Sequence, residues 1–249
     1  MKRALGMFAA LLGLSATGLS TPAFANDDGP LIWHRENVQL LRGFDYELGD
    51  SERTIITLEH GSQWSWGDVF IFGDFTFQDN GERNAYGEIT PRLSLSRLAG
   101  EGPSDEGLLR DTVLVATVEL GDQGVDRYLA GAGIDLNIPG FRFVRLHGFH
   151  RDDPERDGST WQGTIIWNRP FEIAGQNFLS EGFIDIAGAE GPGVANQLYV
   201  PRLLWDAGAN AGNPGRLFLG VEWQYWENKF GVDGVTENVV QLQLKWHLN

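Results

Sequence analysis

The segment Val240-Gln241-Leu242-Gln243-Leu244-Lys245-Trp246-His247-Leu248 alternates apolar and polar residues without a break. A period of two places one set of side chains on one face of a strand and the other set on the opposite face. The preceding segment repeats the pattern, with Leu217, Leu219, Val221, Trp223 and Tyr225 on one side. Two successive segments of this kind predict two-faced β-strands and not helices.

Composition favours a strand-built membrane protein. Both apolar faces include Trp or Tyr near their ends, and the chain contains 33 Gly, 9 Trp and 15 Phe. Aromatic girdles and glycine at strand bends are typical of barrels that face lipid outside and water inside. The mean hydropathy of −0.23 is compatible with this, because half of each strand faces a polar lumen. No segment after the N-terminus approaches 18 continuous apolar residues, which excludes a helical membrane protein.

The N-terminus has the features of a secretory leader. Lys2 and Arg3 precede an apolar stretch from Ala4 to Leu14, and Ala23-Phe24-Ala25 forms a small-x-small cleavage site. An uncleaved anchor helix is the alternative, but spanning a bilayer takes roughly 20 apolar residues and Pro22 interrupts this stretch. We therefore predict a signal peptide over 1–25 and one barrel domain over 26–249, located in the bacterial outer membrane.

Charge and cysteine content exclude several classes of site. Removal of Lys2 and Arg3 with the leader takes the formal net charge from −15 to −17. Nucleic acid is an improbable partner for so acidic a chain, since phosphate binding needs clustered Lys and Arg. The chain has no cysteine, so disulfides and thiolate metal sites are excluded. No metal site and no cofactor are predicted.

Turn-forming clusters divide the chain into segments of about ten residues, the length of one transmembrane strand. Nine clusters are clear and two are weaker, and they predict about twelve strands. They lie at 48–51, 61–67, 79–82, 100–107, 121–124, 137–140, 152–158, 170–175, 188–193, 207–215 and 231–234. The predicted fold class is all-β, a closed antiparallel transmembrane barrel. Because eight strands give a filled interior and sixteen an open pore, about twelve predict a narrow channel for one small solute.

The alternation also predicts which side chains face the lumen. Acids, arginines and phenylalanines recur on the inward faces. The predicted solute-contacting residues are Glu59, Phe70, Phe72, Asp74, Glu88, Arg92, Phe183, Asp185 and Arg202. Pro91 and Pro201 lie within predicted strands, where proline removes a ladder donor, so both are expected near a rim or a bulge with the following arginine turned inward. Arg42 is ambiguous, since it shares a face with Leu40 and Phe44.

Several short motifs follow one another from about Trp33 to the C-terminus. They are Ile32-Trp33-His34, Asn37-Val38-Gln39, Asp45-Tyr46-Glu47-Leu48, Thr57-Leu58-Glu59-His60, Gly67-Asp68 to Asp74, Tyr86 to Ser94, Glu181 to Asp185 and Asn196-Gln197-Leu198-Tyr199. In their order and spacing, these motifs together resemble the Tsx-type nucleoside-specific channel-forming outer-membrane proteins. One departure is the C-terminus, where the family's terminal aromatic is replaced by His247-Leu248-Asn249 after Trp246.

The resemblance implies a monomeric twelve-stranded barrel that passes nucleosides and deoxynucleosides by facilitated diffusion, and that phage or colicins use as a receptor in some members. A nucleoside is an uncharged flat base on a polyhydroxyl sugar. Inward phenylalanines offer ring faces for stacking, carboxylates accept from hydroxyls, and Arg92 and Arg202 donate to carbonyl or sugar oxygens. Binding must be weak and spread over several sites to permit flux. No energy source is implied.

Other interpretations stay open at this stage. Inward acids and arginines also pair as structural networks, and inward Phe also fills space. A nonspecific small-solute porin, a soluble periplasmic barrel and an adhesion-type structural barrel are alternatives. An outer-membrane hydrolase is a further one, but His147 and His150 fall on opposite faces of one strand, and His60 with Ser62 lacks a third partner. We predict that the protein is not an enzyme.

Overall fold

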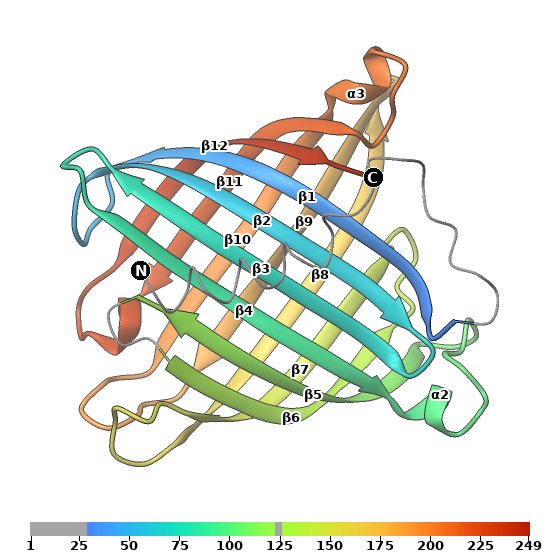
Figure 1. Cartoon of the computed structure of the whole chain (residues 1–249), viewed down its shortest axis with the longest axis horizontal. Helices are drawn as coiled ribbons and strands as arrows, with labels where there is room; N and C mark the ends of the chain where they lie inside the picture. The colour runs from blue at the N-terminus through green and yellow to red at the C-terminus, as the bar shows by residue number, and fades with distance from the viewer. Residues whose placement is uncertain (1–28, 123–125) are drawn as a thin grey trace.

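The computed structural model describes residues 29–122 and 126–249, and these form a barrel of twelve strands (Figure 1). The predicted leader over 1–25 lies outside the described residues. The strands are β1 (Leu31–Phe44), β2 (Glu52–Trp64), β3 (Gly67–Gln78), β4 (Arg83–Ser94), β5 (Leu109–Gly121), β6 (Asp126–Leu136), β7 (Phe143–Asp152), β8 (Thr160–Ile173), β9 (Gln176–Ala187), β10 (Asn196–Asp206), β11 (Leu217–Glu227) and β12 (Glu237–His247).

Every strand pairs antiparallel with its sequence neighbours, and β1 closes the ring by pairing with β12. Val38 lies opposite Trp246 and Leu40 opposite Leu244 at this seam. A closed ring leaves no sheet edge, so every strand has a hydrogen-bonding partner on both sides. The predicted fold class and strand count are confirmed. Two predicted turns are shorter than expected, because β2 continues to Trp64 and β8 continues to Ile173, and the turn predicted at 121–124 lies partly outside the described residues.

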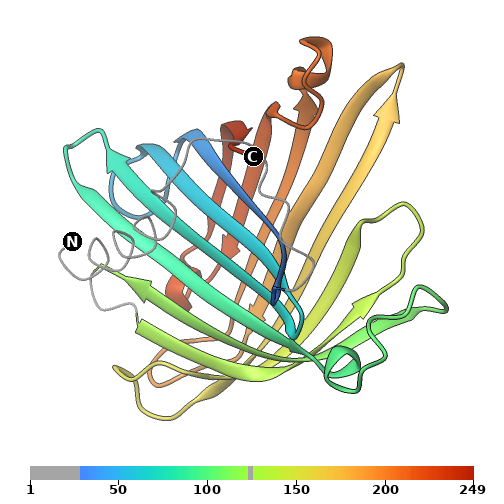
Figure 2. The same ribbon diagram turned by 45° about the vertical axis from the view of Figure 1, so that its right-hand side comes forward.

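The two ends of the barrel are referred to below as the terminal rim and the loop rim. β1 starts and β12 ends at the terminal rim, which also holds the short helices α2 (Leu95–Leu98) and α3 (Ala207–Asn210) (Figure 1). The β8–β9 hairpin projects from this same rim beside the α3 loop (Figure 2). The loop rim holds the 3-10 turn η1 (Lys229–Gly231). None of the helices in the described ranges is long and apolar enough to cross a membrane.

Polarity in this barrel is the reverse of that in a soluble domain. Along β12, Glu237, Gln241 and Lys245 are buried, whereas Val240 and Leu242 are 57% and 63% exposed. Other exposed apolar side chains on the outer wall include Leu114, Leu203, Leu219 and Trp223. An apolar band outside a closed ring with polar side chains inside is the arrangement of a transmembrane barrel. The chain forms a transmembrane β-barrel, as predicted.

Aromatic side chains on the outer wall gather toward both rims. Those toward the loop rim are Phe44, Phe77, Tyr128, Trp161, Tyr199 and Tyr225, and those toward the terminal rim are Trp64, Phe171, Phe178, Trp205 and Trp246. Amphipathic rings of this kind sit at the headgroup level of a bilayer. The two groups therefore mark the upper and lower limits of the membrane-spanning band.

The two strand prolines are not near rims or bulges, so that part of the prediction is wrong. Pro91 lies within β4 and Pro201 within β10, with the register unchanged on either side of each. The ladder instead loses pairing locally, between Ile89 and Arg92 toward β5 and between Tyr199 and Arg202 toward β11. A continuous barrel tolerates this loss because the flanking pairs hold the register.

Arg42 faces outward from β1, which resolves the ambiguity in the first strand. Its guanidinium donates to Asp79 at 2.8 Å and also to Glu52, and it lies 5.0 Å from the ring of Phe44. The hydrogen bond from Arg42 lowers the pKa of the Asp79 carboxyl. The cation is thus compensated at the loop rim and does not enter the apolar band unpaired.

Candidate functional site

Contacts across the ring show which side chains line the lumen. Arg202 on β10 reaches Glu59 on β2, although three strands, β11, β12 and β1, separate these two around the ring. Such contacts are possible only through the interior, and alternation then assigns the rest of each face. All the predicted solute-contacting residues face inward: Glu59, Phe70, Phe72, Asp74, Glu88, Arg92, Phe183, Asp185 and Arg202. Their contact with a solute stays a prediction.

Five charged residues form a network across one sector of the lumen, called the glutamate network. Arg202 donates to Glu222 at 2.5 Å and to Glu59 at 3.4 Å. Lys245 donates to Glu181 at 2.6 Å and to Glu59 at 3.1 Å. Three acids and two cations leave one net negative charge in this sector.

Amide side chains complete the hydrogen bonding of the three glutamates. Asn37 donates to Glu59 at 2.8 Å, Asn168 to Glu181 at 3.0 Å, and Gln241 to Glu222 at 2.8 Å. Buried charges that lack partners are costly, whereas fully bonded ones hold a fixed arrangement. The glutamate network is therefore a fixed part of the lumen wall.

A second network, the aspartate network, lies across the opposite sector. Arg92 on β4 donates to Asp135 and to Asp68, the latter at 3.2 Å, and Arg145 on β7 donates to Asp68 at 3.5 Å. Two acids and two cations give this network no net charge. The Nε atoms of Arg92 and Arg145 and Nε2 of His147 have no hydrogen-bond partner among the described residues.

Three lumen carboxylates, called the carboxylate tier, have no cationic partner within 29–122 and 126–249. Asp74 accepts from Thr57 at 2.5 Å, Glu88 from Tyr86 at 2.7 Å, and Asp185 from Thr164 at 2.5 Å. In each of these three hydrogen bonds the donor is a hydroxyl, and the Gln162 amide also interacts with Asp185.

The carboxylate tier lies on the loop-rim side of both networks. Asp74 follows Asp68 on β3 and Asp185 follows Glu181 on β9, and both strands run toward the loop rim. Glu88 precedes Arg92 on β4, which runs the other way. A solute crossing from the loop rim therefore passes the carboxylate tier before it reaches the glutamate and aspartate networks.

Aromatic rings line the lumen beside the carboxylate tier. Phe70 and Phe72 on β3 have ring centroids 6.1 Å apart, and Phe72 lies 5.9 Å from Tyr86. Phe70 is 38% exposed, so neighbouring side chains do not cover its whole ring. Phe183 lies between Glu181 and Asp185 on the inward face of β9. Exposed ring faces next to acceptors suit a flat, hydroxylated solute.

Tyr46 lies at the loop-rim mouth, and sequence reasoning did not single it out as a lumen residue. Asp45 adopts the left-handed conformation with φ of 66°, and this turns Tyr46 back over Gly43. The buried hydroxyl donates to Gln241 at 2.6 Å. Burial raises the pKa of Tyr46 above its usual value. The signal for this fold-back was the Gly43-Phe44-Asp45-Tyr46 turn, but its direction depends on β12 across the seam.

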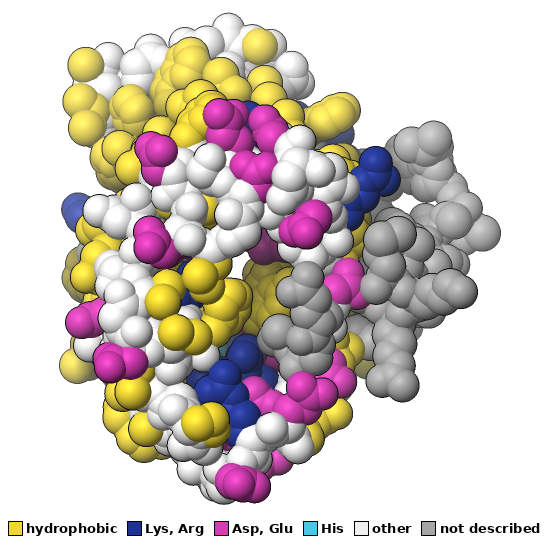
Figure 3. Space-filling view, turned by 90° about the vertical axis from the view of Figure 1, so that its left-hand side faces the viewer, with side chains coloured by type: hydrophobic (Ala, Val, Ile, Leu, Met, Phe, Trp, Pro, Cys, Tyr) yellow, Lys and Arg dark blue, Asp and Glu magenta, His cyan; other side chains and the backbone are white. Residues whose placement is uncertain are grey.

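The two mouths differ in charge. Acidic side chains are spread around the loop rim, while basic side chains gather in the hollow inside it (Figure 3). At the terminal rim, Arg35, Arg142 and Arg216 are exposed and make no ion pair with any described residue. Arg142 and Arg216 lie close enough to Arg35 for their charges to act on it. A basic mouth at this rim was not predicted.

The histidines do not assemble a catalytic or metal site. His147 is buried in the lumen wall, whereas His150 is exposed on the opposite face of β7. His34 and His60 both hydrogen-bond Glu36 through Nδ1, at 2.9 and 2.7 Å, and Ser62 accepts from Trp64 instead. Within the described part of the chain, no group of three or more His, Asp or Glu residues is arranged to hold a metal ion.

The chain matches no protein-family model and no curated protein. Among solved structures it is similar to the KdgM porin, at 8% identity with a TM-score of 0.49, over 84% of this chain and 98% of that one. It is also similar to the Acinetobacter baumannii outer membrane protein Omp33, at 12% identity with a TM-score of 0.39, over 88% and 99%. No residue role is transferred from either. The resemblance to Tsx-type channels stays a prediction.

Proposed function

We propose that the barrel is a passive outer-membrane channel for small neutral solutes, and that nucleosides are its cargo. The observation that supports this most directly is the carboxylate tier, in which Asp74, Glu88 and Asp185 accept hydrogen bonds from hydroxyls and form no ion pair with the described residues. A hydroxyl-bearing solute offers the same kind of donor as the two threonines and the tyrosine that hydrogen-bond these carboxylates. The tier can thus exchange its internal hydrogen bonds for bonds to a sugar.

Ring stacking supplies the second part of recognition. Phe70 and Phe72 present tilted rings on the strand that also holds Asp74. A base stacked on such a ring contributes roughly 1–3 kcal/mol, and every base has a π-face. The sugar of a stacked nucleoside would lie against Asp74 or Glu88. Weak contacts of this kind keep the solute moving.

Anions should be excluded by the same residues. A phosphate group brought to Asp74, Glu88 and Asp185 meets uncompensated negative charge in a narrow space, where charge interactions exceed those in bulk water. The glutamate network adds a further net negative charge at the middle of the lumen. Nucleosides should therefore pass and nucleotides should not.

Liposome swelling with purified barrel tests this proposal. Adenosine and thymidine should enter, whereas their monophosphates should enter at least tenfold more slowly. A triple variant, D74N/E88Q/D185N, should narrow that difference. Equal rates for nucleosides and nucleotides through the wild-type barrel would reject the proposal.

A nonspecific small-solute porin is the second candidate. The favouring observation is that the two networks bond largely within themselves and so present few free groups to a solute. Planar-bilayer recordings separate the candidates. A nucleoside channel should show current reduced by millimolar adenosine, whereas a nonspecific porin should conduct equally with and without it.

A further inference from the structure

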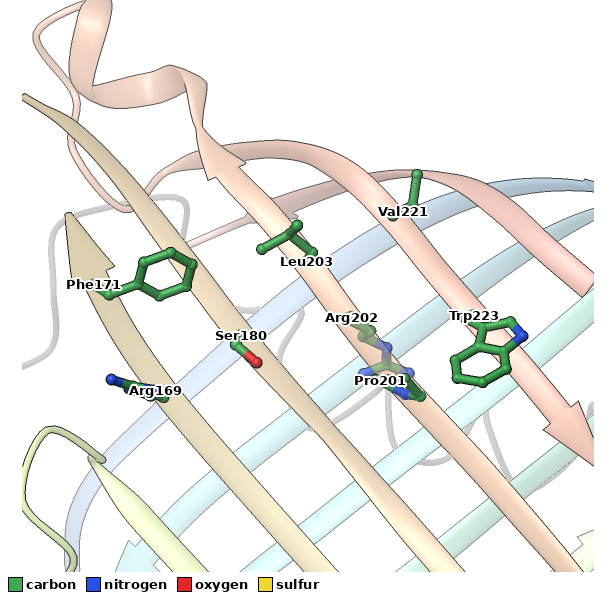
Figure 4. A pocket seen from close by; sticks show the side chains of 8 residues that line it. All are labelled: Arg169, Phe171, Ser180, Pro201, Arg202, Leu203, Val221 and Trp223. Atoms are coloured by element: carbon green, nitrogen blue, oxygen red, sulfur yellow. The ribbon is translucent and has the colours of Figure 1, made fainter. Parts of the chain in front are cut away.

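The outer wall of the barrel has a groove over β8 to β11, with a volume of 480 Å³ (Figure 4). Its walls and floor are formed by Arg169, Phe171, Ser180, Pro201, Leu203, Val221 and Trp223. Arg202 borders it only through its base, because its guanidinium points into the lumen toward Glu222. The volume lies within the range of ordinary small-molecule sites.

Small residues create the groove. Gly182 stands between Trp167 and Pro201 in the register, and a Cβ there would lie 2.3 Å from the carbonyl oxygen of Val200. A larger residue would clash with the neighbouring backbone at this position, so no side chain fills the outer surface of β9 here. Phe171 and Trp223 rise on either side of Pro201 and Leu203 (Figure 4). The depression is thus set by the backbone as well as by side chains.

The occupant must come from the hydrocarbon phase, because this face belongs to the apolar band. Leu203 and Trp223 are 49% and 41% exposed on it. An acyl chain is the ligand that a bilayer supplies to an apolar groove at this depth. A water-soluble solute would have no access to it.

A cation stands at the β8 edge of the groove. Arg169 is exposed, lies 5.4 Å from the ring of Phe141, and makes no ion pair with the described residues. β8 ends at Ile173, so Arg169 lies near the rim, where headgroups are found. An uncompensated arginine is notable in a chain of net charge −15. Its charge complements a lipid phosphate.

We propose that this groove binds one anionic phospholipid, with an acyl chain between Phe171 and Trp223 and the phosphate on Arg169. Native mass spectrometry of the detergent-solubilised barrel tests this with phosphatidylglycerol and phosphatidylcholine of identical chains. One phosphatidylglycerol should remain bound per barrel. R169Q should reduce its retention about fivefold, the effect of one basic residue near an anionic headgroup, and bring it to the level of phosphatidylcholine.

Two further variants keep the test decisive. V221W fills the groove without altering a charge and should abolish retention of both lipids. R83Q removes another exterior arginine that lies over a phenylalanine, 5.6 Å from Phe77 at the loop rim and outside the lining of this groove, and should change nothing. A heat-shift gel confirms that each variant is folded. Equal retention of the two lipids, an R83Q effect as large as that of R169Q, or a stable barrel dimer with the groove buried would overturn the proposal.

Discussion

The middle of the lumen and the tier on its loop-rim side are built from the same residue types but in opposite ways. In the middle, Arg202 and Lys245 bridge glutamates from strands that are far apart in the ring. In the carboxylate tier, Asp74, Glu88 and Asp185 accept hydrogen bonds from hydroxyls and form no ion pair with the described residues. The comparison indicates that paired charges fix the wall and unpaired ones meet the solute.

Removing a cation from the middle should have the largest effect. R202A leaves Glu59, Glu181 and Glu222 sharing one lysine, and breaking a buried ion pair costs about 3 kcal/mol or more. Equilibrium unfolding in guanidinium, followed by tryptophan fluorescence, should show this loss. The control, R42A, removes an exposed pair at the loop rim and should cost far less. Equal losses for both would contradict a structural role for the glutamate network.

Neutralising the carboxylate tier should alter transport and leave stability nearly unchanged. D74N, E88Q and D185N keep the size and hydrogen-bonding capacity of each side chain and remove its charge. Nucleotide entry in liposome swelling should rise about tenfold in the triple variant, because the repulsion is gone. A large loss of stability with no change in selectivity would show that the carboxylate tier stabilises the barrel, and would contradict its proposed role in solute selection.

Truncating the lumen rings should have a smaller effect. F70A and F72A each remove a stacking face of roughly 1 kcal/mol, which is about a fivefold weakening of adenosine binding. Block of single-channel current by adenosine gives that binding constant. F75A, on the lipid-facing side of β3, is the matched control and should leave the block unchanged. If F75A lost the adenosine block while F70A and F72A kept it, the lumen rings would not be the recognition site.

The stability of the barrel is expected to fall modestly at high pH because of Tyr46 at the loop-rim mouth. The pKa of Tyr46 is raised by burial, so the unfolded chain loses this proton before the folded one does. The stabilisation is therefore fully present below about pH 10, the ordinary tyrosine value, and is lost as pH rises above it. Thermal unfolding between pH 9 and pH 11 should show a fall that Y46F lacks. An identical fall in Y46F would show that Tyr46 does not cause this pH dependence.

Alternation and the turn clusters together predicted the fold. The segments ending in Trp226 and His247 fixed the period of two, and the turn clusters gave all twelve strands, because each face meets a different solvent. The same rule placed Glu59, Asp74 and Arg202 inside.

Pairing could not be predicted in the same way. The partners of Arg202 and Arg92 come from distant strands and depend on how the strands stagger as the ring closes. Sequence reasoning therefore did not distinguish the paired Glu59 from the hydroxyl-bonded Asp74. The positions of Pro91 and Pro201 were predicted wrongly, because the hydrogen-bonded pairs on either side of each proline keep the strand in register despite the missing donor. The groove at Arg169 needed three-dimensional contacts to be seen.

The reversal potential of the open channel in a tenfold KCl gradient tests the central claim most directly. The carboxylate tier predicts a cation-selective wild-type barrel and a D74N/E88Q/D185N variant with reduced or lost selectivity. An anion-selective wild-type barrel, or a triple variant with unchanged selectivity, would contradict the claim that uncompensated carboxylates control passage.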